Sequence, residues 1–162
     1  GVISDTHGIL QPAVFDLFEG VDLILHAGDV GNDDLLVELA AIAPVRAVSG
    51  NVDGMPTNER PLARRLSTFV GKIAMTHGHL PDSSAYDPGT LIETFRDFEP
   101  MFIIFGHTHL PTIVERDGVT LFNPGTAGRA TVGGRGPTVG MITLDEGSCR
   151  PRAEHLSLVV RS

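Results

Sequence analysis

Five short apolar runs of this chain each lead into a loop that carries side chains of the metal-binding type. The runs are Val2–Ile3, Val21–Leu25, Val45–Val48, Ile73–Met75 and Met101–Phe105. The side chains that follow them are, in the same order, Asp5 and His7, Asp29, Asn51, His77 and His79, and His107 and His109. Continuous apolar runs are typical of strands that are buried on both faces in α/β proteins. Because open α/β sheets place their sites at the carboxyl ends of strands, we expect these side chains to meet.

The spacing of the apolar residues also predicts how the strands are connected. Helices are expected at 11–19 and 35–42, so the first part of the chain reads strand, helix, strand, helix, strand. This order is typical of a parallel α/β unit. The other expected elements are hairpins at 66–75 and 112–122, a helix at 90–98, and closing antiparallel strands at 138–144 and 152–160. Because no repeat or linker interrupts the pattern, we predict a single domain over residues 1–162.

The composition excludes several classes of function. The chain has 162 residues and 41% hydrophobic content, enough for a sizeable core that must be largely aliphatic because aromatic residues are only 6%. Its net charge is -8 with histidine neutral, and no basic run exceeds Arg64-Arg65. Stable binding to nucleic acid or to an anionic membrane is therefore not expected. No apolar stretch approaches the roughly 20 residues of a membrane-spanning helix.

The cysteine content bears on the compartment. Cys149 is the single cysteine, which excludes an internal disulfide and fits a reducing compartment. We expect it to be a small strand residue, since no cysteine motif surrounds it. No signal peptide is visible, so a cytoplasmic protein is predicted. The chain begins at Gly1 without a methionine, and a few residues are expected to be missing before it.

The donors that follow the apolar runs favour a transition metal over calcium. They are Asp5, His7, Asp29, Asn51, His77, His107 and His109. Carboxylates, imidazoles and a carboxamide suit Mn(II), Fe, Zn, Ni or Co, and the lack of a thiolate argues against a structural zinc site. The set exceeds one tetrahedral shell but suits two metal ions that share a bridging carboxylate. Such a centre stays positive, so it can attract phosphate although the chain as a whole is acidic.

These donors form a recognisable series of motifs. In chain order the motifs are Asp5-x-His7, Gly28-Asp29, Gly50-Asn51, His77-Gly78-His79 and Gly106-His107-x-His109. The series resembles that of the calcineurin-like metallophosphoesterase superfamily, and the short chain with Thr76-His77-Gly78-His79 is most similar to its small bacterial and archaeal phosphodiesterase branch. The resemblance covers essentially the whole chain. It implies an α/β fold of the αββα type, in which two mixed β-sheets are flanked by helices.

The resemblance also implies which residue binds which metal ion. Asp5, His7 and His109 would hold the first ion, Asn51, His77 and His107 the second, and Asp29 would bridge the two. Two such ions hold a water and lower its pKa, so that hydroxide can attack a phosphodiester in line. Mn(II) is the expected metal, with Fe, Ni, Zn or Co as alternatives. A metal-dependent phosphodiesterase is therefore the leading prediction.

One position departs from the superfamily pattern. In many members a histidine follows the motif asparagine and is thought to protonate the leaving group, but Val52 follows Asn51 here. A positioned general acid is typically worth about 10²–10⁴-fold in rate. We therefore expect aryl and other activated esters to react faster than alkyl esters. His79 and His26 are the candidates to replace the missing acid.

Other residues carry narrower expectations. Asp53 is expected to orient a ligand or cap the local turn, and with Asn51 and His79 it completes the candidate catalytic residues. His26 is otherwise expected to pack beneath the site. His155 lies far from every motif and is expected on the surface or on a sheet face.

Several loops are also expected near the substrate. The loops 54–61, 80–89 and 128–137 are expected to frame the pocket, with Arg129 or Arg135 meeting a substrate phosphate. The turn Asn123-Pro124-Gly125 resembles one that recurs in the phosphodiesterase branch, and we assign it no chemistry.

Two other functions stay open on the sequence. A trafficking-coat subunit of this fold is non-catalytic and binds proteins through apolar surface, although it lacks part of the ligand set that is complete here. A phosphomonoesterase or a nucleotide pyrophosphatase could use the same site. The expected partner is therefore a small phosphate ester or a nucleotide. A homodimer is left open because dimers are the commonest soluble assembly.

Overall fold

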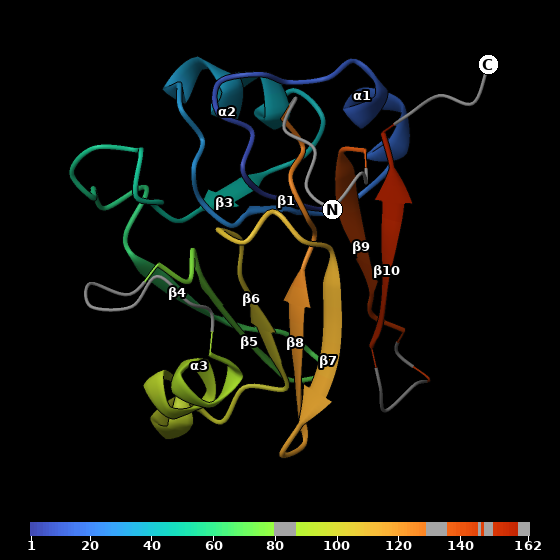
Figure 1. Ribbon diagram of the computed structural model, residues 1–162. Coiled ribbons are helices and arrows are strands. Elements are labelled where there is room, and N and C mark those ends of the chain that lie inside the picture. Colours follow the sequence, from blue (N-terminus) through green and yellow to red (C-terminus); the bar gives the residue numbers. More distant parts are fainter. Residues whose placement is uncertain (80–86, 129–135, 146, 148–150, 159–162) are drawn as a thin grey trace.

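Two five-stranded sheets make up the protein (Figure 1). The computed structural model describes residues 1–79, 87–128, 136–145, 147 and 151–158. The first sheet has the order β10-β9-β1-β2-β3, with β1 (Val2–Ile3), β2 (Ile24–His26), β3 (Val45–Ala47), β9 (Thr138–Thr143) and β10 (Arg152–Ser157). The second has the order β4-β5-β6-β8-β7, with β4 (Ala63–Ser67), β5 (Lys72–Thr76), β6 (Phe102–Ile104), β7 (Thr112–Arg116) and β8 (Val119–Asn123).

Both sheets are mixed. In the first, β1, β2 and β3 are parallel and β9 and β10 are antiparallel additions. In the second, β5, β6 and β8 are parallel, while β4 and β7 pair antiparallel at the two edges. The loops that leave β1, β2 and β3 therefore emerge at one edge of their sheet, and those that leave β5 and β6 at one edge of the other.

The helices lie on the outer faces of the sheets, α1 (Ala13–Leu17) and α2 (Asp33–Ala40) on the first and α3 (Pro88–Thr94) on the second (Figure 1). Successive strand residues point to opposite faces, so each central strand feeds two cores. On β1, for example, Val2 packs between the sheets and Ile3 packs beneath α1 and α2. On β6, Phe102 and Ile104 face the other sheet and Ile103 faces α3. This packing confirms the predicted αββα sandwich and explains the continuous apolar runs.

Several predicted boundaries were wrong by a few residues. The first helix was expected at 11–19 but is only α1, because no side chain caps its start at Pro12 and the backbone of Phe18 is no longer helical. The helix expected at 90–98 begins two residues earlier, since Asp87 accepts a hydrogen bond from the Thr90 amide. It then breaks at Phe95 into a 3₁₀ turn over Arg96–Phe98.

The hairpins were predicted at the right places. The first turns at Thr68–Gly71 rather than at Gly71-Lys72, because the Thr68 amide and hydroxyl both donate to the Gly71 carbonyl. The second turns at Asp117-Gly118 as expected. Cys149, Arg129 and Arg135 lie outside the described residues, as does the end of the strand expected at 152–160. No helix in the described part is long and apolar enough to cross a membrane.

Candidate metal centre

The predicted ligands come together from both sheets. Asp5 and His7 follow β1, Asp29 follows β2 and Asn51 follows β3, all in the first sheet. His77 follows β5, and His107 and His109 follow β6, in the second. The strand ends of the two sheets thus face each other across one site. The sequence alone could place each ligand at a strand end but could not show that the two sheets meet there.

A first cluster of donors contains Asp5, His7, Asp29 and His109. One ligand atom from each of these side chains lies within 4.8 Å of the others. Nε2 of His109 is 3.2 Å from Oδ1 of Asp5 and 3.3 Å from Nε2 of His7. Two carboxylates and two imidazoles that converge in this way can hold a divalent cation of the transition series.

A second cluster lies beside the first and contains Asn51, His77 and His107. Oδ1 of Asn51 is 3.2 Å from Nε2 of His77 and 3.1 Å from Nδ1 of His107. Asp29 faces both clusters, because its Oδ2 atom is 3.3 Å from Nε2 of His77 and 3.9 Å from Nε2 of His7. One carboxylate oxygen is thereby placed between the two groups of donors.

The hydrogen bonds of His77 prepare its other nitrogen for a ligand. Its Nδ1 donates to the Ala27 carbonyl over 2.8 Å, since a carbonyl oxygen can only accept. In the neutral ring, Nε2 then carries the lone pair, and it is Nε2 that faces Asp29 and Asn51. A metal-binding histidine that donates its second N–H to a carbonyl is held in this way.

The backbone of the ligand loops is strained. Five ligand residues adopt the left-handed conformation, with φ of 53° at Asp5, 48° at His7, 53° at Asp29, 66° at His107 and 59° at His109. Elsewhere in the described residues only Glu99 and Asp117 do so among residues other than glycine. Each such residue costs about 1–3 kcal/mol and persists only where its surroundings fix it, which is common at functional sites.

Two glycines let the loops approach the ligand carboxylates. A Cβ atom at Gly50 would lie 2.0 Å from Oδ1 of Asp29. At Gly106 it would lie 2.0 Å from Oγ of Ser4 and 2.7 Å from Oδ2 of Asp5. Any other residue at these two positions would displace a carboxylate, so both glycines are explained by close approach as well as by the turn.

The charges of the metal-free centre balance within the site. Burial raises the pKa of Asp29, but the hydrogen bond and charge of His77 and the Val52 amide outweigh burial and hold it at about 2. Burial lowers the pKa of His77, but hydrogen bonding to Asp29 and the charges of Asp5 and Asp29 raise it overall. The hydrogen bond to Asp5 raises the pKa of His109 in the same way. The two carboxylates thus favour positive charge on the neighbouring imidazoles, and the donor set fits a divalent metal.

Comparison with known proteins agrees with this geometry. The sequence model of the calcineurin-like phosphoesterase superfamily domain matches residues 1–147. The chain belongs to this superfamily. It is 38% identical over 131 residues to a probable metallophosphoesterase of Methanothermobacter thermautotrophicus, an alignment that covers 78% of this chain and 75% of the relative. The family confirms the predicted resemblance and implies divalent metal ions.

Solved structures show the same fold. An archaeal phosphodiesterase superimposes with a TM-score of 0.72 at 26% identity, covering 96% of this chain and 98% of the other. Vps29 of Entamoeba histolytica, solved with zinc, gives a TM-score of 0.74 at 23% identity and covers 96% of each chain. The fold of this chain is therefore shared by an archaeal phosphodiesterase and by a vacuolar sorting protein.

His26 supports the centre of this phosphoesterase from beneath. It is fully buried, its Nδ1 accepts from the Gly28 amide over 3.2 Å, and its Nε2 lies 2.9 Å from Oγ1 of Thr6. Burial lowers the pKa of His26 to about 4, so the ring is neutral near pH 7. A buried neutral ring with both nitrogens satisfied cannot donate a proton to a leaving group. Of the two readings offered by the sequence, packing beneath the site is the one the contacts support.

His79 lies at the second cluster. Its ring centroid is 5.4 Å from that of His77 and 6.3 Å from that of His107. Its Nδ1 is buried and, within the described residues, makes no hydrogen bond. Burial, and then the charges of His77 and His107, lower its pKa, so the ring is neutral in the metal-free protein. His79 therefore packs as a neutral ring beside two predicted ligands of the second cluster, His77 and His107.

Asp53 ties two ligand loops together. Its Oδ1 accepts from the Gly31 amide and its Oδ2 from the Gly50 amide, each over 2.8 Å. Burial raises the pKa of Asp53, but these two amides lower it overall. Arg60 donates to the Asp53 carbonyl over 2.9 Å and pairs with Asp33. Both carboxylate oxygens are occupied, which fits the predicted orienting role and not that of a base.

Residues that the motifs do not include also support the centre. Ser4 is fully buried and donates to Oδ2 of Asp5 over 2.6 Å. The turn that begins at Asn123 contacts the loops that leave β1 and β6. The signal that could have found them is a polar residue at the end of an apolar run, as Ser4 follows Val2–Ile3 and Asn123 follows Phe122.

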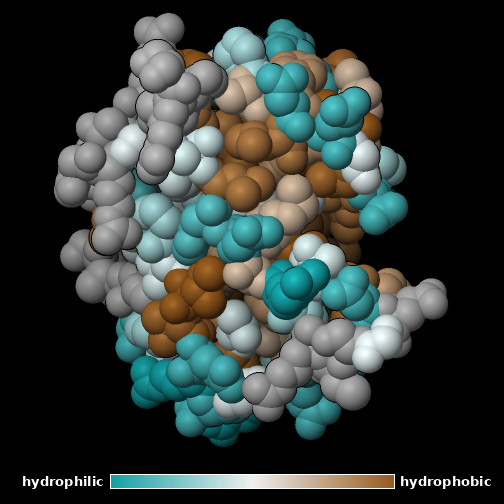
Figure 2. Space-filling model, turned by 90° about the vertical axis from the view of Figure 1, so that its right-hand side faces the viewer, coloured by the Kyte–Doolittle hydropathy of each residue, from teal (hydrophilic) through white to brown (hydrophobic). Residues whose placement is uncertain are grey.

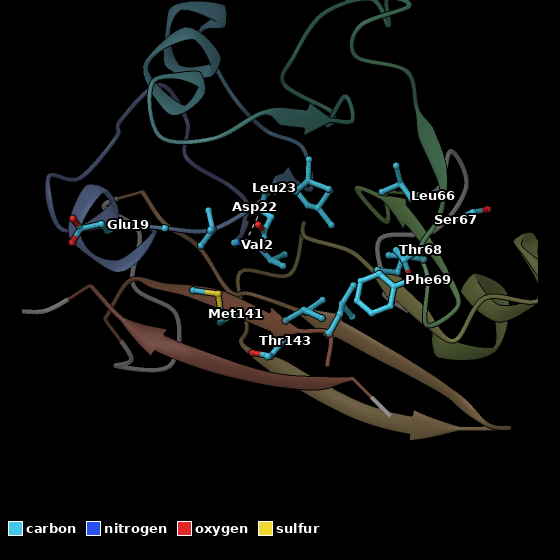
Figure 3. Close-up of a pocket in the computed structure, with 17 residues that line it drawn as sticks. Val2, Glu19, Asp22, Leu23, Leu66, Ser67, Thr68, Phe69, Met141 and Thr143 are labelled. Carbon is cyan, nitrogen blue, oxygen red and sulfur yellow. Dashed lines mark hydrogen bonds between the residues drawn. The ribbon is translucent and has the colours of Figure 1, made fainter. Parts of the chain in front are cut away.

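A large cavity lies away from the predicted ligands. It has a volume of about 720 Å³ and is lined at the amino ends of β1 and β5 by residues such as Val2, Leu23, Leu66, Ile73 and Met141 (Figure 3). None of the predicted ligands lines it. On the side of the molecule seen in Figure 2, apolar surface is bounded by hydrophilic residues above and below. This cavity does not belong to the metal centre.

Proposed function

We propose that this protein is a phosphodiesterase that uses two divalent metal ions, with Mn(II) as the proposed metal and Fe, Ni, Zn or Co as alternatives. The observation that carries the proposal is the position of Asp29, whose Oδ2 atom faces donors of both clusters. A carboxylate in this place can bridge two ions. The likeness to an archaeal phosphodiesterase supports a diester substrate.

The chain's own residues would divide into two ligand groups. Asp5, His7 and His109 would hold one ion, Asn51, His77 and His107 the other, and Asp29 both. When bound, the ions would supply positive charge to a phosphate ester and lower the pKa of a water molecule. Asn51 is a neutral ligand, so it does not reduce the positive charge that attracts an anionic substrate. The hydrogen bonds from Ser4 and from the Val52 amide would hold the two carboxylates in place while substrate binds.

Protonation of the leaving group is the step for which this chain has the fewest candidate residues. Val52 has no proton to donate, His26 is buried and neutral, and His79 has a lowered pKa. We infer that the enzyme favours esters whose leaving group needs no proton, such as aryl esters. His79 would then contribute by orienting substrate through a hydrogen bond.

The experiment that tests the proposal measures hydrolysis of bis(p-nitrophenyl) phosphate with and without added Mn(II), beside the Asp29→Ala variant. We expect turnover that requires the metal and is lost in the variant. The monoester p-nitrophenyl phosphate is measured in parallel, because a faster rate on it would favour a phosphomonoesterase. Turnover that survives both chelation and the Asp29→Ala substitution would contradict the proposal.

A second candidate is a non-catalytic scaffold that binds proteins. Two observations favour it, namely the Vps29-like fold and the apolar cavity between the sheets. The complete set of predicted metal ligands in this chain favours the enzyme over the scaffold. Metal bound in stoichiometric amounts without turnover of a diester, a monoester or a nucleotide would favour the scaffold. Under either function we predict a cytoplasmic protein that does not bind nucleic acid or membrane stably. Whether the protein forms a homodimer is left undecided.

A further inference from the structure

Asn123 is a fully buried carboxamide at the end of β8, and both polar atoms of its side chain are engaged. Its Nδ2 donates to the Gly106 carbonyl over 2.7 Å and to Oγ1 of Thr108 over 3.0 Å. Its Oδ1 accepts from the Gly125 amide over 2.9 Å. Both side-chain N–H groups thus reach a single loop, the one that leaves β6.

The two acceptors stand on either side of a predicted ligand. Gly106 precedes His107 and Thr108 follows it, and Thr108 also separates His107 from His109. The Thr108 amide donates to the same Gly106 carbonyl over 2.7 Å, which closes a tight turn around His107. His107 and His109 both have left-handed backbone. A carboxamide that binds the backbone before and the side chain after His107 therefore fixes a conformation that histidine does not favour on its own.

The segment that follows Asn123 holds the ligand loop of the other sheet. Oγ1 of Thr126 donates to the Asp5 carbonyl over 2.9 Å, and the Ala127 amide donates to the Ser4 carbonyl over 2.9 Å. The Gly128 amide reaches the Asp5 carbonyl over 3.2 Å. Residues 123–128 consequently connect the loop that carries Asp5 to the loop that carries His107, which belong to different sheets.

His155 holds this segment from the opposite side. Its Nε2 donates to the Asn123 carbonyl over 2.8 Å, and its ring stacks on Phe122 at a centroid distance of 5.1 Å. His155 lies on a sheet face, one of the two positions predicted for it. Its hydrogen bond to the Asn123 carbonyl also connects it to the residue that fixes the ligand loop. Asn123 is thus held through its backbone by β10 while its side chain acts on the loop after β6.

We propose that Asn123 is a positioning residue for the metal centre, which sets the places of His107 and His109 by clamping the turn between Gly106 and Thr108. The proposal rests on the proposed function, since it concerns the same ligands. Loss of a residue that orients metal ligands typically weakens metal binding by about 10–100-fold. Asn123 touches neither substrate nor reacting atoms, so its effect passes through the two histidines.

The test measures Mn(II) binding to Asn123→Leu, a substitution that keeps the side-chain shape and removes the donors. We expect binding about 10–100-fold weaker than in the wild type, measured by calorimetry below the melting temperature. Thr108→Val removes one of the two acceptors and leaves the Gly106 carbonyl in place, so it is expected to weaken binding by a smaller factor. If Asn123→Leu does not fold, Thr108→Val is used for the test in its place.

The matched control is Leu39→Ala, which opens a cavity in the core beneath α2 and touches no predicted ligand. It is expected to lower the melting temperature while leaving Mn(II) binding within about threefold. The absorption spectrum of the Co(II)-loaded protein gives a second readout, because it reports the ligand geometry around the metal. We expect it to change in Asn123→Leu and in Thr108→Val but not in the control.

Unchanged Mn(II) binding and an unchanged Co(II) spectrum in both clamp variants would overturn the positioning role. Equal losses in the clamp variants and in Leu39→Ala would also overturn it, since they would follow stability alone. A wild type that binds no metal would instead contradict the proposed function, so the two failures are distinguishable.

Discussion

Asp29 and His77 come from different sheets, yet Oδ2 of Asp29 lies 3.3 Å from Nε2 of His77. This contact joins the two clusters of donors and links the ligand that would bridge two ions to a histidine of the second sheet. Because the Ala27 carbonyl accepts the hydrogen on Nδ1 of His77, any second proton that this ring takes up stands on Nε2, between the two side chains. The consequences for metal binding, catalysis and stability can be measured.

Metal binding should release protons and weaken at low pH. Hydrogen bonds and the charges of Asp5 and Asp29 raise the pKa values of His77 and His109 above the ordinary 6.5 in the metal-free protein, so these rings take up protons at a higher pH than a free imidazole. A metal must displace them, which makes apparent affinity fall as pH decreases, with the decline beginning above pH 6.5. Calorimetric titration with Mn(II) in buffers of different ionisation enthalpy should show that metal binding releases protons, and more of them as the pH is lowered. Binding that is independent of pH between 6 and about 8 would contradict this assignment.

Replacing Val52 with histidine should accelerate esters with poor leaving groups. Val52 is 52% exposed and follows the ligand Asn51, so the substitution costs little stability. A new acid can contribute about 10²–10⁴-fold when well placed, and we expect at least tenfold on a dialkyl diester, which must expel an alkoxide, with little change on an activated aryl diester. Val52→Ala is the control and should leave both rates near the wild type. Equal rates in the histidine and alanine variants would show that leaving-group protonation does not limit the reaction.

The stability of the metal-free protein should depend on His26 in acid. Its folded pKa is lowered to about 4 from 6.5, so the unfolded chain binds more protons between these values and unfolding becomes easier as pH falls through 6.5. Between pH 7 and 5 this group should remove about 2 kcal/mol of unfolding free energy. Urea denaturation with chelator present, at both pH values, should therefore show a shallower pH dependence for His26→Gln than for the wild type. Parallel pH profiles for the two proteins would argue against a buried neutral His26.

A methyl group at Gly50 should damage the centre without disturbing the fold at large. The new Cβ would lie 2.0 Å from Oδ1 of Asp29, so the carboxylate must move away from its position between the clusters. We expect Gly50→Ala to weaken Mn(II) binding and to cost about 1–3 kcal/mol of unfolding free energy, as overpacking does. Within the described part of the chain, no heavy atom lies within 4 Å of a Cβ added at Gly147, so Gly147→Ala serves as the control and should match the wild type. Intact Mn(II) binding in Gly50→Ala would mean that Asp29 need not occupy this place.

The ligands could be predicted because each stands directly after an apolar run. Asp29 and His107, for example, follow strands that are apolar on both faces since one face meets a helix and the other meets the second sheet. Chain order alone then places them at strand ends. The residues at which each strand ends were harder to predict. Strand β1, for example, ends at Ile3, two residues before Asp5 adopts a left-handed backbone conformation. The pattern of apolar residues carries no signal for that change.

The supporting residues could not be predicted in the same way. Asn123 acts on Gly106 and Thr108, which lie 17 and 15 positions earlier in the chain. Its role depends on the parallel pairing of β6 and β8, which brings the ends of the two strands together. The neutral state of His26 likewise depends on burial by the folded chain. Contacts of this kind are decided by tertiary packing and leave no periodic signal in the sequence.

The most direct test of the account is the rate of diester hydrolysis as Mn(II) is added to the metal-free protein in known equivalents. If Asp29 joins two metal sites, activity should rise and level off at two equivalents per chain, and excess chelator should abolish it. The Asp29→Ala variant should stay inactive throughout the titration. Activity that is complete before any Mn(II) is added and resists chelation, or bound Mn(II) with no turnover at any ratio, would contradict the account.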